Sequence, residues 1–349
     1  MRKNVTIQDI ADALGLSRNT VSKAINNTEG LADATRERIL QKAVEMGYKQ
    51  FSYVGTLTNV VASSTKAQSE VPGFVGEIAL FTTSYLNSSH FASLMLDKFH
   101  REISQLGYTM NTHRVTPENL AELSLPITFH PERTSAIICI EMFDRAYDEM
   151  VCALGMPILF VDGPSKQDGF SLPADQLYMD NTTEITRFVN DMLKKGHQRI
   201  GFLGDYNHCQ SFYERYAAFR CAMLMAGTPV EERHCIRYNS VPDMEEKLAA
   251  LSDYPDIFIC ANDFVATDAM QALQKLGKRI PEDIGICGFD DSAESRASHP
   301  TITTIHIHTQ IMAFSAVHLL ISRIKEPSLD YRVIHTETDL IYRDSTKME

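Results

Sequence analysis

The chain has 349 residues, of which 44% are hydrophobic, and a formal net charge of −12. This length exceeds that of a typical single domain, and the hydrophobic content is sufficient for more than one core. The excess of acids argues against nucleic-acid binding over the whole surface. The chain has seven cysteines without a CxxC pair, which favours reduced thiols. It shows no signal peptide and no apolar run of membrane-spanning length, so we expect a cytoplasmic protein.

Basic charge is concentrated near the N-terminus. Residues 1–50 hold eight lysines and arginines against six acids, which leaves a charge of −14 on the other 299 residues. A nucleic-acid ligand is therefore expected to bind the first 50 residues. Because their excess of basic charge is small, tight binding is expected to need two copies, as in a symmetric homodimer on a palindromic site.

The stretch from Thr6 to Asn26 predicts two short amphipathic helices joined by a tight turn at Gly15, a residue that readily adopts positive φ. Apolar residues recur at helical spacing before and after this turn: Ile7, Ile10, Ala11, Leu14, Val21, Ala24 and Ile25. The outer face of the second helix carries hydrogen-bond donors and no acid: Arg18, Asn19, Thr20, Ser22 and Lys23. Such a face suits the DNA major groove. An ordinary helical hairpin with a solvated face is the alternative.

Two segments, VTIQDIADALGLSRNTVSKAINN and TRERILQKAVEMGY, resemble the headpiece of the lactose-repressor/galactose-repressor family of bacterial transcriptional regulators. The resemblance implies that the second helix reads base edges through Arg18, Asn19 and Lys23. It also implies that four residues hold phosphates: Thr6, Thr20, Ser22 and Asn26. A third helix is expected from Asp33 to Met46.

The segment after the headpiece departs from the family pattern. Members usually continue with a Pro-Asn start and an Ala-Arg-x-Leu hinge helix, whose leucine enters the minor groove. Residues 50–69 read QFSYVGTLTNVVASSTKAQS instead, which favours a strand or flexible linker. Leu57 is the leucine available for a wedge. We therefore expect a headpiece at 1–49 and an atypical hinge at 50–75.

From Gly76 onward, buried strands alternate with helices. Strands are expected at 76–83, 135–141, 157–162, 199–205, 256–263 and 283–291, and helices at 91–106, 147–154, 182–195, 213–225 and 264–276. This alternation predicts an α/β ligand-binding and dimerisation domain, residues 76–349, with two doubly wound lobes and a cleft between them. Lobe one is expected at about 76–179 and 294–325, and lobe two at about 180–293 and 326–346.

Four body segments extend the resemblance: YMDNTTEITRFVNDMLKKGHQRIGFLGD, SFYERYAAF, CANDFVATDAMQALQKLGKRIPEDIGICGFDDS and HPTITTI. The resemblance implies an effector domain similar to periplasmic sugar-binding proteins, with a small polar ligand held by Asp162, Arg215, Asn262 and Asp290. Carboxylate, guanidinium and amide groups suit hydroxyl-rich ligands. Three residues after the first strand are expected to make aromatic or polar contacts with the ligand: Tyr85, His90 and Phe91. Tyr238 is another candidate. The alternatives are that Asn262 caps a helix, that Asp290 caps a turn and that Arg215 lies on the surface.

The whole pattern predicts a sequence-specific transcriptional regulator, a repressor controlled by a sugar, with no cofactor. No leucine heptads follow the closing strand expected in 336–346, which favours a homodimer over a coiled-coil tetramer. Two other functions remain open: control by a protein partner, and an enzyme on the same fold. His306 and His308 share a strand face, but no third metal ligand is evident nearby, so we expect no metal site.

Overall fold

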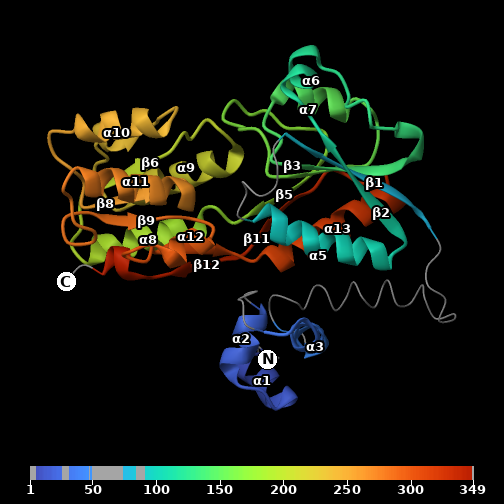
Figure 1. Ribbon diagram of the computed structural model, residues 1–349, viewed down its shortest axis with the longest axis horizontal. Helices are drawn as coiled ribbons and strands as arrows, with labels where there is room; N and C mark the ends of the chain where they lie inside the picture. Colours follow the sequence, from blue (N-terminus) through green and yellow to red (C-terminus); the bar gives the residue numbers. More distant parts are fainter. Residues whose placement is uncertain (1–4, 26–30, 47, 49–73, 84–90, 348–349) are drawn as a thin grey trace.

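The computed structural model describes residues 5–25, 31–46, 48, 74–83 and 91–347. They form a small helical headpiece below a body of two α/β lobes (Figure 1). Residues 50–73 of the predicted hinge, including Leu57, lie outside the described residues, as do Asn26, Tyr85 and His90. The predicted fold class is confirmed by this arrangement of a helix-turn-helix and two parallel sheets.

The headpiece consists of α1 (Ile7–Leu14), α2 (Arg18–Ile25) and α3 (Asp33–Met46). Thr6 caps α1 in a capping box with Asp9, and Gly15 ends the helix with a φ of 64°. Ser17 accepts a hydrogen bond from the backbone N–H of Thr20 at 3.0 Å and thereby caps α2. The three helices share one small core, because none is long enough to be stable alone.

Six parallel strands form the sheet of the first lobe, in the order β11-β5-β4-β3-β1-β2. Their bounds are Gly76–Thr82 (β1), Tyr108–Arg114 (β2), Thr134–Ile140 (β3), Ile158–Val161 (β4), Asp175–Met179 (β5) and Val333–Thr336 (β11). Alternate side chains of β3 enter two different cores, so both faces of the sheet are buried.

Helices cover the two faces of this sheet. One face packs against α5 (Ala92–Gln105) and α13 (Thr309–Lys325), and the other against α7 (Arg145–Cys152) with α6 (Pro117–Glu122) beside it. Ile311 and Phe314 of α13 also contact the core of the headpiece. The underside of the first lobe therefore faces the headpiece (Figure 1).

A four-stranded parallel sheet, ordered β7-β6-β8-β9, forms the second lobe. Its strands are β6 (Ile200–Leu203), β7 (Cys235–Ile236), β8 (Ile257–Cys260) and β9 (Gly285–Cys287). Its helices are α8 (Thr183–Lys194), α9 (Gln210–Met225), α10 (Val241–Ala249), α11 (Asp263–Lys275) and α12 (Ala293–Ala297). Short 3-10 turns lie at Pro131–Arg133, Glu232–His234 and Asp344–Thr346.

The chain passes between the lobes three times, and two of these crossings differ from the expected lobe boundaries. β10 (Thr304–Ile307), expected in lobe one, pairs antiparallel with β12 (Thr338–Ile341) and bridges to the second lobe at Asp290. β11, expected in lobe two, instead pairs with β5 in the first sheet. The polypeptide therefore crosses from one lobe to the other after β5, after β10 and after β11. Among the described helices, none is both long and apolar enough to cross a membrane.

Candidate functional site

The outer face of α2 carries the side chains predicted to contact DNA. Arg18 and Asn19 are exposed and Lys23 is partly exposed, whereas Val21 and Ala24 point into the headpiece core. Arg18 and Asn19 begin the helix, at the end that reads base edges in helix-turn-helix proteins. The predicted reading face is thus accessible, although contact with DNA stays a prediction.

Two hydroxyl groups predicted to hold phosphates also support the local structure. The Thr6 hydroxyl lies 2.7 Å from a carboxylate oxygen of Asp9, and the hydroxyl groups of Thr20 and Ser17 are 2.7 Å apart. Thr6 is exposed, while Thr20 and Ser22 are partly exposed. Thr20 and Ser22 lie on α2 and Thr6 caps α1, and their contact with phosphates stays a prediction.

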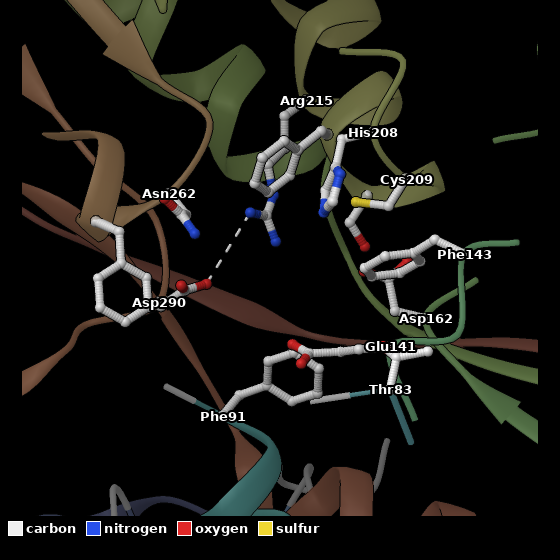
Figure 2. Close-up of a pocket in the computed structure, with 13 residues that line it drawn as sticks. Thr83, Phe91, Glu141, Phe143, Asp162, His208, Cys209, Arg215, Asn262 and Asp290 are labelled. Atoms are coloured by element: carbon white, nitrogen blue, oxygen red, sulfur yellow. Dashed lines mark ion pairs between the residues drawn. The ribbon is translucent and has the colours of Figure 1, made fainter. Parts of the chain in front are cut away.

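A cavity of about 330 Å³ lies between the two lobes (Figure 2). The first lobe lines it with Thr83, Phe91, Glu141, Phe143 and Asp162. The second lobe lines it with His208, Cys209, Ser211, Phe212, Arg215, Asn262, Phe264 and Asp290. Because both lobes contribute polar groups, a ligand here can contact the two lobes at once. The cavity contains all four residues predicted to bind an effector through polar groups.

Arg215 is held inside the protein rather than on its surface, since only 2% of the residue is exposed. It donates hydrogen bonds to Asn181 Oδ1 at 2.9 Å and to the Ala261 carbonyl oxygen at 2.6 Å. Its guanidinium lies 3.5 Å from the Phe289 ring centre and 4.0 Å from Asp290 Oδ1. Burial lowers the pKa of Arg215. These contacts fix the orientation of a cationic donor at the cavity wall.

Asn262 caps a helix and also lines the cavity. Its side-chain oxygen accepts the backbone N–H of Val265 at 3.0 Å and caps α11, while the residue also lines the cavity. The amide nitrogen is a donor that the capping bond leaves available in the same side chain. Helix capping therefore orients the amide and does not exclude ligand contact.

Asp263 fixes the loop that presents Asp290. Its buried carboxylate accepts the Ser292 backbone N–H and the Thr304 hydroxyl, both at 2.7 Å. A Cβ atom on Gly288 would lie 2.1 Å from an Asp263 oxygen, so this close approach requires glycine. Burial and the nearby charge of Asp290 raise the pKa of Asp263 to about 6.

Glu141 and Asp162 stand side by side because their strands pair in register. Ile140 of β3 is opposite Val161 of β4, so the next residue of each strand reaches the same sheet edge. Both adopt left-handed backbone conformations, with φ of 53° and 54°. Asp290 also has positive φ, 115°. Such strained backbone at non-glycine residues is typical of functional sites.

The aromatic lining is larger than the sequence predicted. Phe91 lines the cavity as expected, whereas Tyr238 packs against the core of the second lobe. Four ring-bearing residues were not predicted: Phe143, His208, Phe212 and Phe264. Phe143 and His208 reach across from different lobes, with ring centres 4.8 Å apart. Phe212 could have been predicted from the sequence, because it lies one helical turn before Arg215 on the same face of the helix.

The two histidines considered as metal ligands each contact a different carboxylate. His306 Nδ1 lies 2.9 Å from Asp291, and His308 Nε2 lies 3.2 Å from Asp339. Within the described residues, one cluster of three such side chains has metal-like spacing, formed by Glu231, His234 and Asp253. Arg233 contacts both of its carboxylates. Arginine thus supplies the positive charge that a metal would bring.

Comparison with protein families matches both parts of the chain. The family model "Bacterial regulatory proteins, lacI family" matches residues 6–50, and "Periplasmic binding protein-like domain" matches residues 189–346. The chain is 28% identical to the HTH-type transcriptional repressor PurR of Vibrio vulnificus, over 98% of each chain. It is 26% identical to the HTH-type transcriptional regulator GalR of Lacticaseibacillus casei, over 98% of this chain and 99% of the relative.

Solved structures share the fold over nearly the whole chain. The complex of the transcriptional regulator CelR with cellobiose is similar with a TM-score of 0.67 and 20% identity, covering 98% of this chain and 100% of that one. The lac repressor dimer bound to operator and the anti-inducer ONPF is similar with a TM-score of 0.62 and 22% identity, covering 99% of each. At these identities the structural likeness establishes the fold alone.

Proposed function

Because the chain belongs to the lacI family of bacterial regulatory proteins and is a DNA-binding transcriptional regulator, we propose that it is a homodimeric repressor controlled by a sugar bound between its lobes. The cavity carries this proposal, since polar side chains from both lobes line it. Cellobiose in the similar CelR structure supports a sugar, as do the phenylalanine rings of the cavity, which can stack on a sugar face.

The cleft explains how ligand binding can change DNA binding. A ligand that contacts Glu141 in one lobe and Arg215 in the other favours one angle between the lobes. Such a ligand shifts the equilibrium only by its difference in affinity for the two arrangements. In a dimer, a changed lobe angle alters the spacing of the two headpieces, and helix-turn-helix dimers need a fixed spacing to enter successive major grooves.

The experiment that tests this function selects binding sites from random DNA with the purified full-length protein. We expect a palindromic site, because two identical headpieces related by a two-fold axis read inverted half-sites. The operator complex is then titrated with sugars, nucleosides and cell extract fractions in an anisotropy assay. A selection that recovers no palindrome contradicts the proposal. A response confined to a protein fraction would instead favour control by a protein partner.

Arg18→Ala is expected to relax the choice of base at one position of each half-site. Its exposed guanidinium can make paired hydrogen bonds to guanine, and losing such a contact costs about 1–3 kcal/mol. Anisotropy titrations against a panel of single-base variants of the operator measure this discrimination. Arg38→Ala is the control, because Arg38 is an exposed arginine on α3 rather than on the reading face. Equal losses on all operator variants would contradict a base contact by Arg18.

Thr20→Ala is expected to weaken binding to all operator variants alike. A phosphate contact fixes position without reading bases, so its loss leaves the ranking of sequences unchanged. The Ser17 side chain still accepts the backbone N–H of residue 20, and α2 should therefore keep its cap. Anisotropy titrations on the same panel measure the effect, and circular dichroism checks the helix content. A changed ranking of operator variants would contradict this role.

A further inference from the structure

The headpiece contacts the first lobe through the beginning of α13. Ile311 and Phe314, both partly buried, project from this helix and pack against the hydrophobic core shared by α1, α2 and α3. Figure 1 shows the headpiece below α5 and α13. Two apolar side chains of the body therefore add to the core of the headpiece, and the apolar area that they bury favours this position.

A cation from the neighbouring helix contacts the Phe314 ring. The Nζ atom of Lys98, on α5, lies 4.8 Å from the centre of this ring, which is within the range of a cation–π contact. The same Nζ atom lies 2.7 Å from a carboxylate oxygen of Glu102. Lys98 is only 5% exposed, so packing fixes its position. The ring that contacts the headpiece is thus supported by α5 as well as by α13.

The contact lies where two of the three crossings between the lobes pass. Ile311 is in the first turn of α13, directly after the crossing from β10. Glu337 lies in the crossing between β11 and β12, and Asp339 lies on β12. Burial raises the pKa of Tyr48, the last described residue of the headpiece, and the nearby charges of Asp339 and Glu337 raise it further. The headpiece therefore lies against the region in which the chain passes from one lobe to the other.

The two crossings are also joined to each other. The Nε2 atom of His308, the residue before α13, lies 3.2 Å from a carboxylate oxygen of Asp339. β10 and β12 pair antiparallel, and β10 bridges to the second lobe at Asp290. The surface under the headpiece thus combines α13 of the first lobe with strands that lead into the second. A change in the angle between the lobes is absorbed in such connecting segments, so it changes the shape of this surface.

The reading face stays accessible in this position. Arg18 and Asn19 are exposed while Ile311 and Phe314 contact the headpiece core. The contact therefore leaves α2 open to DNA and gives the headpiece a defined place on the body. In a dimer, two headpieces held in this way have one spacing, and half-sites in successive major grooves require one spacing. Holding them in place before binding also reduces the entropy lost on binding.

We propose that the surface formed by the start of α13 and by β12 is a docking site for the chain's own headpiece, and that docking sets the spacing of the two headpieces on the operator. This inference rests on the proposed function, since it explains how a change of lobe angle alters operator binding. The segment after the headpiece lacks the Ala-Arg-x-Leu hinge motif, and the docking site supplies a positioning contact that does not depend on this motif.

A fluorescence experiment tests the docking without DNA or effector. The chain has no tryptophan, so Tyr48→Trp introduces a single probe at the docking site. Acrylamide quenching is measured on full-length Tyr48→Trp protein, alone and combined with Phe314→Ala or Ile311→Ala. We expect each alanine to raise the quenching constant at least about twofold, because loss of apolar contact shifts the headpiece toward the undocked state. Circular dichroism checks that the helix content is kept.

Ile324→Ala is the matched control on the same helix. Ile324 is a partly buried residue near the end of α13 that packs against the core of the body and not against the headpiece. Its replacement removes a similar apolar side chain from α13, so it should leave the quenching constant of the Tyr48→Trp protein unchanged. An effect of Phe314→Ala that is absent in Ile324→Ala is specific to the docking site.

Operator binding tests the role in spacing. Operators from the random selection are lengthened or shortened by one base pair at their centre, and anisotropy titrations without effector give the preference for the selected spacing. We expect Phe314→Ala and Ile311→Ala to reduce this preference at least about threefold, because undocked headpieces reach more than one spacing. Ile324→Ala should keep the preference. A variant that is merely less stable would lose affinity equally for all spacings.

Three results would overturn the inference. An unchanged quenching constant in both Phe314→Ala and Ile311→Ala would exclude the docking site. An equal rise in Ile324→Ala would show a general loosening of α13 instead. A raised quenching constant with an unchanged spacing preference would exclude the role in spacing. Failure to select a palindromic operator would contradict the proposed function and with it the role in spacing, whereas the quenching measurement still decides whether the headpiece docks.

Discussion

Arg215→Ala is expected to raise the effector concentration needed for a response at least about thirtyfold, which corresponds to a loss of about 2 kcal/mol or more in binding. Truncating one partner of a buried, hydrogen-bonded charge pair costs about 2–5 kcal/mol in binding. Arg215 supplies both the donor that faces the cavity and the cation beside Asp290. The loss is measured by titrating the operator complex with the effector and following DNA anisotropy.

Operator binding without effector should survive this change, because Arg215 lies in the body and not in the headpiece. The melting temperature should fall, since Asn181 and the Ala261 carbonyl lose a buried donor. Arg215→Lys should recover little of the response, as an ammonium cannot reproduce the planar arrangement of guanidinium donors. The effector response and operator binding without effector, measured together, distinguish loss of ligand binding from loss of DNA binding.

Arg220→Ala is the matched control on the same helix. Arg220 is partly buried and contacts Glu232 and Tyr216, outside the cavity. We expect its replacement to leave the effector response within about twofold, because partly exposed ion pairs contribute little. An Arg215→Ala protein that still responds at the original effector concentration would contradict the assignment of the cavity as the effector site.

Local sequence patterns were sufficient for the elements that position the site. The apolar strands β3, β4, β6 and β8, and the helices that follow β3, β6 and β8, were predicted from hydrophobic runs with clear ends. The family resemblance assigned Asp162 and Asn262 to the cleft, and their places at predicted strand ends supported it, because the carboxyl ends of parallel strands share one edge. Arg215 needed the family resemblance, since nothing in a helical arginine itself indicates burial.

Long-range pairing explains what the sequence did not predict. Val333 of β11 pairs with Gln176 of β5, far away in the chain, and no local pattern identifies that partner. The lobe boundaries were therefore wrong at β10 and β11. The same reasoning covers Phe143 and Phe264, which were not predicted, because their contribution to the cavity depends on how the lobes face each other. Glu141 ends the predicted strand 135–141 as Asp162 ends the predicted strand 157–162, so the same strand-end rule would have identified it.

Asp148→Asn is expected to stabilise the protein in a strongly pH-dependent way. Asp148 lies on α7, above the strands that carry Glu141 and Asp162, and is completely buried. Neither carboxylate oxygen has a hydrogen-bond partner among the described residues. Burial, with a smaller contribution from the charge of Asp144, raises the pKa of Asp148 to about 8.

The direction of the effect follows from proton linkage. The folded protein holds the Asp148 proton more tightly than the unfolded chain, in which the carboxyl has its ordinary pKa of about 4. The free energy of unfolding is therefore highest below about pH 4 and falls as the pH rises toward about 8, by on the order of 5 kcal/mol. Asparagine carries no proton to lose, so the variant should lack this fall. Its amide still leaves buried polar atoms unsatisfied, at a cost of about 1–3 kcal/mol.

Urea unfolding at pH 5 and pH 9, which gives the free energy of unfolding at each pH, tests this prediction. The free energy of unfolding of Asp148→Asn minus that of the unchanged protein should be near zero at pH 5 and about 3 kcal/mol at pH 9. Taking this difference cancels the titration of all other groups that the substitution does not touch. Glu149→Gln, an exposed neighbour on α7, should show no such change with pH. A difference for Asp148→Asn that stays constant between pH 5 and pH 9 would mean that the carboxyl is ionised throughout, and that the first lobe tolerates a buried charge beside the strands that lead to Glu141 and Asp162.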